Sequence, residues 1–160
     1  KILRRDWNMI HGVKTRKLAV HCDERGRLME MLRADDKEMD VRFGQVYMTT
    51  AYPGVTKAWH YHKLQTDHFV CVSGMIKLVL YDNREDSPTK GEINEFFIGE
   101  HNQTIVEIPF LVYHGFKCIS EKEAIIVNTV TECYNYADPD EYRVAPHSGE
   151  IPYDWSRKDG

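Results

Sequence analysis

Short apolar or alternating runs, separated by turn-forming residues, recur along most of the chain and limit what it can fold into. The runs are rich in valine, isoleucine, phenylalanine and tyrosine, which prefer pleated, half-buried strands. Proline, glycine, asparagine and serine stand between the runs. The pattern predicts an all-β fold, either a closed sandwich or a barrel. The expected strands cover residues 17–21, 43–51, 68–73, 75–81, 95–98, 104–108, 116–119 and 124–130.

Two segments depart from this pattern. Residues 27–36 place their leucines and methionines at a weakly helical spacing, but a strand that frays into an irregular loop fits them equally. Residues 135–160 are polar and contain prolines, yet they also carry several tyrosines and Trp155, so we expect an ordered coil packed on the domain. We predict one domain over residues 1–160, with its core at about 17–134 and a packed C-terminal tail at 135–160.

The composition fits one folded domain and excludes several classes of protein. With 42% hydrophobic residues among 160, the chain can bury a sizeable core, which excludes disorder over its whole length. A net charge of -4 argues against a nucleic-acid partner, and no apolar run is long enough for a membrane span. The four cysteines lie far apart without a CxxC pair, so we expect them to be reduced and the protein to be cytoplasmic.

The segment from Gly54 to Gly74 holds the side chains best suited to chemistry. His60 and His62 share one face of a strand because side chains alternate with a period of two. Asp67 follows beyond a short turn. Three interpretations stay open at this point. The histidines and the carboxylate bind a divalent metal, one histidine acts as a general base without a metal, or the pair is an ordinary exposed strand face.

This spacing resembles the two cupin motifs, GX5HXHX4EX6G and PXGXXH. The positions that match are Gly54, His60, His62, Gly74, Pro109 and His114, with Asp67 in place of the first motif's glutamate. The resemblance implies a metal site in which the ligands, if a metal is bound, are His60, His62, Asp67 and His114. Imidazole and carboxylate ligands suit Zn, Fe, Ni or Mn.

A second set of ordered motifs covers residues 17–136. They are Asp23-Glu24-Arg25-Gly26, Lys57-Ala58-Trp59-His60-Tyr61, the stretch from Asp82 to Gly91, Ile108-Pro109 and His114-Gly115-Phe116. The set resembles the dTDP-4-dehydrorhamnose 3,5-epimerase family. The resemblance implies a cupin-type jelly roll, or double-stranded β-helix, that forms a homodimer and takes a nucleotide-linked 4-keto-6-deoxy sugar. In that chemistry a base removes a proton from C3 or C5, an enolate forms, and an acid returns a proton to the opposite face.

The family resemblance also implies a role for each matched residue. It makes His60 the catalytic base and Asp159, in the segment 156–159, the residue that orients it. It makes Arg25 a residue that reaches a neighbouring active site. The other expected substrate contacts are Gln45, Lys57, His62, Arg84, His114 and Tyr134. Of these, Arg84 would meet a diphosphate.

Two positions depart from the family pattern. Asp67 stands where the family has a lysine that stabilises the enolate, and a carboxylate there repels an oxyanion unless a metal intervenes. Val127 stands where the family has an acidic tyrosine, and a valine has no proton to give. The proton would then come from Tyr134, Tyr61 or Tyr47.

A further resemblance also implies a metal site. Residues 53–57 with the HxH pair, and 139–142 near the end, resemble the metal-binding cupin domain of bacterial capsule-sugar reductases, which epimerises C3 of a 4-keto sugar nucleotide. A metal there would stabilise the enolate in place of the missing lysine.

We therefore predict a nucleotide-sugar epimerase or isomerase of a 4-keto-6-deoxy hexose, working by 3,5- or 3-epimerisation in polysaccharide or deoxysugar biosynthesis. If the chain is typical of the family it needs no cofactor; otherwise a divalent metal is expected. Two alternatives come from other classes: a metal-dependent cupin enzyme of different chemistry, such as a dioxygenase or a sugar-phosphate isomerase, and a non-catalytic sugar-nucleotide-binding cupin.

Overall fold

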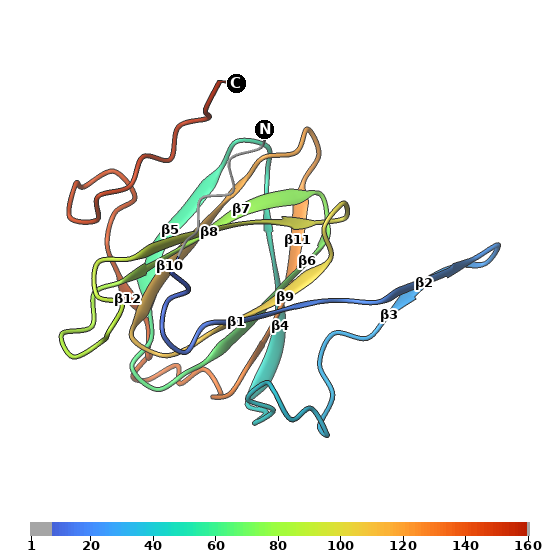
Figure 1. Cartoon of the computed structure of the whole chain (residues 1–160), viewed down its shortest axis with the longest axis horizontal. Coiled ribbons are helices and arrows are strands. Elements are labelled where there is room, and N and C mark those ends of the chain that lie inside the picture. Colours follow the sequence, from blue (N-terminus) through green and yellow to red (C-terminus); the bar gives the residue numbers. More distant parts are fainter. Residues whose placement is uncertain (1–7, 160) are drawn as a thin grey trace.

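The computed structural model describes residues 8–159, which form two five-stranded antiparallel sheets facing each other (Figure 1). One sheet has the strand order β1-β9-β6-β11-β4, and the other has the order β12-β5-β10-β7-β8. The strands are β1 (Lys14–Lys17), β2 (Val20–Asp23), β3 (Gly26–Met29), β4 (Gln45–Ala51), β5 (Thr56–Tyr61), β6 (Asp67–Ser73), β7 (Met75–Asp82), β8 (Ile93–Gly99), β9 (Thr104–Ile108), β10 (Val112–Cys118), β11 (Ala124–Val130) and β12 (Tyr142–Arg143). The predicted all-β jelly roll of the cupin type is confirmed, and residues 8–159 contain no helix long enough to cross a membrane.

The core fills the space between the sheets with alternate side chains of the central strands. Ile76, Leu78 and Leu80 point inward from β7, and Ile126 points inward from β11, all of them fully buried. Inward and outward side chains alternate along these strands, which explains the period of two in the sequence. Burying each such side chain contributes about 1.5–3 kcal/mol. Towards one end of the barrel these apolar layers give way to polar side chains, which form the site described below.

Two expectations about the N-terminal part need correction in detail. The strand expected at 17–21 is divided, because β1 pairs with β9 in the sheet while β2 leaves it to pair with β3. The weakly helical segment 27–36 is a strand followed by an irregular loop. Its apolar spacing has another cause: Met29, Met31 and Leu32 pack on a buried cluster over the outer face of the first sheet.

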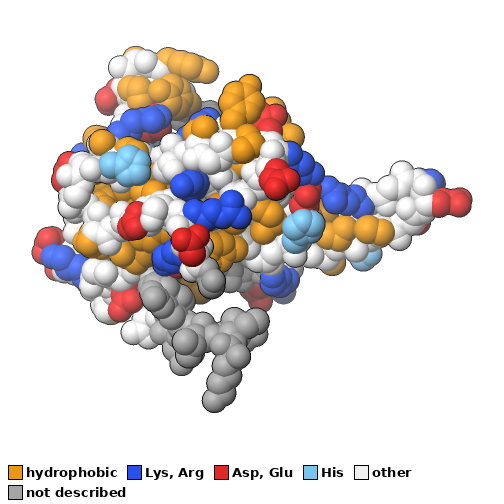
Figure 2. Space-filling model, turned by 90° about the horizontal axis from the view of Figure 1, so that it is seen from above, with side chains coloured by type: hydrophobic (Ala, Val, Ile, Leu, Met, Phe, Trp, Pro, Cys, Tyr) orange, Lys and Arg blue, Asp and Glu red, His pale blue; other side chains and the backbone are white. Residues whose placement is uncertain are grey.

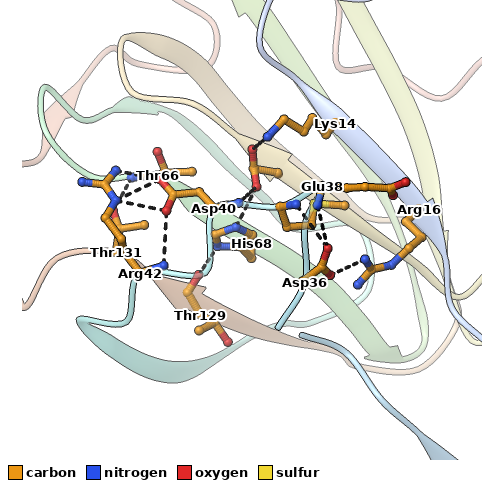
Figure 3. A network of polar contacts seen from close by, with 12 residues as sticks. Lys14, Arg16, Asp36, Glu38, Asp40, Arg42, Thr66, His68, Thr129 and Thr131 are labelled. Atoms are coloured by element: carbon orange, nitrogen blue, oxygen red, sulfur yellow. Dashed lines mark hydrogen bonds and ion pairs between the residues drawn. The ribbon is translucent and has the colours of Figure 1, made fainter. Parts of the chain in front are cut away.

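A polar network ties the following loop to that outer face (Figure 3). His68 points outward from β6, with Nδ1 2.8 Å from the Thr129 carbonyl oxygen and Nε2 3.0 Å from the Glu107 carboxylate. Glu107 also accepts a hydrogen bond from the backbone N–H of Asp40 and pairs with Lys14 at 2.9 Å. Because neighbouring residues of a strand face opposite ways, this network directs Asp67 into the barrel.

The segment after β11 packs on the second sheet, as its aromatic content predicts. β12 pairs with β5, opposite Tyr61 and His60. Further along, Trp155 is buried against Trp59, with ring centroids 4.9 Å apart. The tail therefore lengthens the sheet that carries the histidines and covers its outer face.

The β2-β3 hairpin projects away from the barrel, and two views at right angles show it as an extended arm (Figures 1 and 2). Seven of its eight strand residues are exposed. Arg25 lies in the turn at its tip, where its guanidinium pairs with Asp23. The arm thus carries Arg25 away from the barrel of its own chain.

Candidate active site

Three histidines of the second sheet meet inside the barrel. His60 lies near the end of β5 and His62 just beyond it, on the same face of the strand. His114 lies on β10 in direct register with His60, and the two rings are 4.0 Å apart. The strands approach closely beside this pair because residue 115 is glycine. A Cβ there would lie 2.2 Å from the Cβ of Ala58.

Asp67 enters the same space from the first sheet. It is the first residue of β6 and is completely buried. Its Oδ1 accepts hydrogen bonds from Gln65 Nε2 at 3.0 Å and from Asn128 Nδ2 at 2.6 Å. Two amides therefore hold one carboxylate oxygen, and the other oxygen, Oδ2, faces the histidines.

The backbone fixes how the two buried imidazoles present their nitrogens. His62 Nδ1 donates to the Asp140 carbonyl oxygen at 2.5 Å, and His114 Nδ1 donates to the Val112 carbonyl oxygen at 3.0 Å. In a neutral ring the other nitrogen, Nε2, then carries a lone pair. Both Nε2 atoms point at Asp67 Oδ2, at 3.4 Å from His62 and 3.6 Å from His114. Within residues 8–159 none of these three atoms has a hydrogen-bond partner.

His60 differs from the other two histidines because it borders an open cavity and is only partly buried in it. Burial lowers the pKa of His60 well below its usual value, and the neighbouring imidazoles of His114 and His62 lower it further. The ring is consequently neutral near pH 7 and can accept a proton. No hydrogen bond or ion pair to its ring occurs among residues 8–159.

The cavity has a volume of about 1020 Å³, a size typical of small-molecule sites. Polar and aromatic side chains from both sheets and from the tail line it. The lining residues that the sequence singled out are Gln45, Tyr47, Lys57, His60, His62 and Tyr134. His114 and Asp67 lie behind this wall, fully buried.

Tyr47 lies on β4, across the cavity from His60 on β5, because the two strands belong to opposite sheets. Its hydroxyl oxygen accepts a hydrogen bond from Asn128 Nδ2 at 2.7 Å. The backbone N–H of His68 donates to Asn128 Oδ1, which fixes the orientation of that amide. The phenolic hydrogen is therefore free to be donated elsewhere. Burial, and then the nearby Asp67 carboxylate, raise the pKa of Tyr47, so the phenol stays protonated.

The other two tyrosines considered as proton donors, Tyr61 and Tyr134, are less suited to that role. Tyr61 faces the outside of the second sheet, where it packs between Tyr113 and Tyr142. Tyr134 is at the rim of the cavity, with its backbone N–H donating to Gln45 Oε1 at 2.7 Å.

Three expected site residues do not lie at this cavity. Arg25 is at the tip of the projecting hairpin, and Arg84 binds Asp82 at 2.8 Å beside a separate hollow. Asp159 is exposed, and no hydrogen bond joins it to His60. The segment before it covers the outer face of the sheet, through Trp155 on Trp59, whereas His60 points inward. The structure therefore does not support Asp159 as the residue that orients His60.

Val127 itself does not face the cavity. Val127 pairs with Val70 on the outward side of β11, and the inward side chain at this level is Asn128. A shift of one residue exchanges the two faces of a strand. A polar residue on the otherwise apolar inward face, after Ala124 and Ile126, is the sequence signal that identifies Asn128.

Sequence reasoning also missed how Asp140 organises the site. Its carboxylate accepts hydrogen bonds from the backbone N–H groups of Lys63, Leu64 and Gln65, at 2.8, 2.9 and 3.2 Å. Its carbonyl oxygen receives Nδ1–H of His62. Asp140 is thus a positioning residue that holds the turn after β5 and the orientation of His62.

Comparisons with known proteins agree with this architecture. The family model described as dTDP-4-dehydrorhamnose 3,5-epimerase matches residues 8–160. The chain is 47% identical to "Probable low-salt glycan biosynthesis epimerase Agl13" of Haloferax volcanii, over 92% of this chain and 95% of that protein. It is 41% identical to "Spore coat polysaccharide biosynthesis protein SpsL" of Bacillus subtilis, over 92% and 97%.

Solved structures of sugar isomerases and epimerases have the same fold. The fold superposes on a dTDP sugar isomerase from Desulfovibrio desulfuricans with a TM-score of 0.87 and 30% identity, covering 94% of each chain. It also superposes on NovW, a 4-keto-6-deoxy sugar epimerase from Streptomyces spheroides, with a TM-score of 0.82 and 25% identity, covering 94% of this chain and 77% of that one.

The Asp140 carboxylate generates a prediction about stability and pH. Burial alone would raise the pKa of Asp140, but its three backbone donors outweigh burial and hold the pKa below the usual value. A lowered pKa contributes stability that is present above the unfolded-state pKa and is lost as the pH falls through the folded-state pKa. We expect Asp140→Asn to reduce the free energy of unfolding by about 1–3 kcal/mol at pH 7, measured by urea denaturation.

The difference between wild type and this variant should shrink as the pH falls below about 4, where the unfolded-state carboxylate begins to take up protons. Asp138→Asn, an exposed change two residues away, serves as the control. An Asp140→Asn protein as stable as the control at pH 7 would contradict the capping role.

Proposed function

The chain belongs to the dTDP-4-dehydrorhamnose 3,5-epimerase family, and we propose that it is a carbohydrate epimerase acting on a nucleotide-linked 4-keto-6-deoxy sugar. The observation that carries this proposal is the neutral imidazole of His60 on the wall of a polar cavity. A base of this kind suits proton removal next to a carbonyl group. The names of the two relatives concern glycan and spore coat polysaccharide synthesis, so we propose a role in making a surface polysaccharide or glycan.

The proposed reaction begins with proton abstraction by His60. The 4-keto group acidifies the hydrogens on C3 and C5, and His60 removes one of them. The electrons of the broken C–H bond form a C=C bond, and the carbonyl oxygen becomes an enolate oxygen. Lys57 and Tyr134 line the more exposed part of the wall, and in this proposal they contact the nucleotide diphosphate. Inversion follows when a proton returns to the opposite face of the same carbon.

Tyr47 is our candidate for the group that returns the proton. It lies on the sheet opposite to the one that carries His60, so the two side chains approach a flat enolate from opposite sides. Its hydroxyl hydrogen is not used by Asn128, which donates to the phenolic oxygen. His60 and Tyr47 together would therefore supply the base and the acid of one epimerisation.

We also propose that the chain is a homodimer in which the hairpin arm docks on a second copy. A two-stranded hairpin alone in water is only marginally stable, and Leu28 on the arm is 61% exposed. The outward face of β4 is apolar as well, with Val46 55% and Met48 64% exposed. Docking would cover these side chains and bring Arg25 towards the cavity of the partner.

A cytoplasmic location is part of the same proposal. All four cysteines are free, and two of them, Cys71 and Cys118, are buried as small apolar side chains. Unpaired cysteines are typical of a reducing compartment.

Deuterium exchange measured by NMR tests the reaction. The protein is incubated in heavy water with dTDP-, UDP-, GDP- and CDP-linked 4-keto-6-deoxyhexoses. We expect label at C3, at C5 or at both, and a loss of at least about 100-fold in His60→Gln because the base is removed. His101→Gln, an exposed histidine, is the matched control and should exchange like wild type. Tight nucleotide-sugar binding without label would instead identify a non-catalytic binder.

Tyr47→Phe separates the two halves of the reaction. Proton removal by His60 should persist within a few fold, while formation of the inverted sugar should fall by about 100-fold or more. Comparing solvent exchange with product stereochemistry gives the two rates. Tyr61→Phe changes a tyrosine on the outer face and should alter neither rate. Equal loss of both rates in Tyr47→Phe would show that this phenol is not the separate acid.

Light scattering tests the dimer. We expect a mass twice that of the 18.8 kDa chain at micromolar concentration. Arg25→Ala should keep that mass but raise KM for the sugar nucleotide, because the arginine reaches the partner's cavity. A monomer with full activity would refute the arrangement.

A further inference from the structure

A second hollow lies on the outer face of the second sheet, behind the histidines. Its volume is about 500 Å³, within the range of small-molecule sites. Its lining includes Tyr61, Asn83, Arg84, Asp86, Leu111 and Tyr113. Tyr61 and Tyr113 face outward because their neighbours His60 and His114 face inward. The proposed epimerisation uses none of the side chains in this hollow.

Two tyrosines form the wall of the hollow nearest the sheet. The rings of Tyr61 and Tyr113 have their centroids 4.5 Å apart and their planes tilted by 45°. Both side chains are only partly buried, so part of each ring is left for a ligand. The face of an aromatic ring is negative and attracts weakly positive C–H groups, while the phenol hydroxyl forms hydrogen bonds. This wall therefore suits a ligand that carries both C–H and hydroxyl groups.

The charges around the hollow do not favour an anionic ligand. Arg84 Nε and Nη2 lie 2.8 and 2.9 Å from the Asp82 carboxylate oxygens. Lys90, the other basic residue of the loop between β7 and β8, pairs with Glu85 at 2.6 Å. Asp86 adds an exposed carboxylate to the same rim. The expected contact of Arg84 with a diphosphate finds no support in this arrangement, whereas a neutral ligand fits it.

Leu111 at the edge of the hollow has a strained backbone. Its φ of 65° lies in the left-handed region, which residues with a Cβ rarely adopt. Its N–H donates to the His62 carbonyl oxygen at 2.7 Å, and its side chain is 36% exposed. Strain of this kind gathers at binding sites, where the surrounding structure maintains it. The strained turn thus presents an apolar side chain beside the tyrosines.

We propose that this hollow binds a neutral pyranose, either a free sugar or the end unit of a glycan. The C–H groups of the sugar would pack on the tyrosines and on Leu111. The Asn83 amide and the Asp86 carboxylate have two polar atoms each, which suits neighbouring hydroxyl groups. The proposed dimer leaves the hollow open, because it uses the arm and β4 rather than the second sheet (Figure 1).

An NMR titration of the ¹⁵N-labelled full chain tests the site. The probes are methyl α-glucopyranoside, methyl α-rhamnopyranoside and maltotriose, with glycerol and sodium pyrophosphate as controls. We expect saturable shifts of the backbone amides of residues 83–87 and 111–113, with a dissociation constant of about 1 mM for a single sugar. Neither control should saturate these shifts. Maltotriose binding at least about tenfold tighter than the monosaccharides would identify a glycan as the ligand, and equal affinity would identify a single sugar.

Variants of the hollow separate lost binding from lost folding. Tyr113→Ala and Asp86→Ala should each weaken sugar binding by about tenfold, because a wall or a hydrogen-bonding group is removed. Leu111→Gly should also weaken it, yet melt close to wild type, since glycine adopts a positive φ without strain. Tyr52→Ala changes a 70% exposed tyrosine outside the hollow and should bind as wild type does. His60→Gln should also bind normally.

Several results would overturn the proposal. They are absence of saturable binding by all three sugars, shifts confined to residues of the inner cavity such as Gln45 and Tyr134, and undiminished binding in both Tyr113→Ala and Leu111→Gly. A proline-rich peptide that shifts the same amides while sugars do not would identify a peptide groove instead. Sugar binding here in a wild type that exchanges no deuterium into substrate would keep this site and remove the epimerase.

Discussion

The buried carboxylate of Asp67, which faces two imidazole nitrogens, is the constraint on which the interior of this barrel depends. Two amides hold one of its oxygens, and the other is left to the nitrogens of His62 and His114. A charge buried this completely is costly unless a cation or a full set of donors compensates it. The surrounding side chains supply donors to only one oxygen. The other oxygen faces the two imidazole nitrogens and has no hydrogen-bond partner among residues 8–159.

The jelly roll makes this arrangement possible because it brings two sheets together around one polar end. The histidines come from β5 and β10 of one sheet, and Asp67 and Asn128 come from β6 and β11 of the other. The tail closes the site through Asp140, which holds the turn between His62 and Asp67. The same opposition of sheets places Tyr47 across the cavity from His60. In the proposed reaction, the base and the acid therefore face each other across the space where a flat enolate would lie.

Much of this was predictable from sequence because it depends on local patterns. Alternation and turn residues gave the strands, and the HxH spacing with Asp67 and His114 gave the cluster. What failed depends on distant parts of the chain. That Asn128 rather than Val127 faces inward depends on the register of β11 with β4 and β6, and motif matches could not say which face of the sheet Asp159 would approach. The contact of Asp140 with His62 uses a backbone carbonyl 78 residues away, which leaves no mark in composition or spacing.

The proposed chemistry depends on His60, which removes a proton next to the carbonyl group of the sugar. The most direct test is deuterium uptake by a nucleotide-linked 4-keto-6-deoxyhexose, measured in heavy water for wild type, for His60→Gln and for the exposed control His101→Gln. Exchange at C3 or C5 should fall by at least about 100-fold in His60→Gln and stay at the wild-type rate in His101→Gln. Exchange at the full rate in His60→Gln would contradict the role of this imidazole.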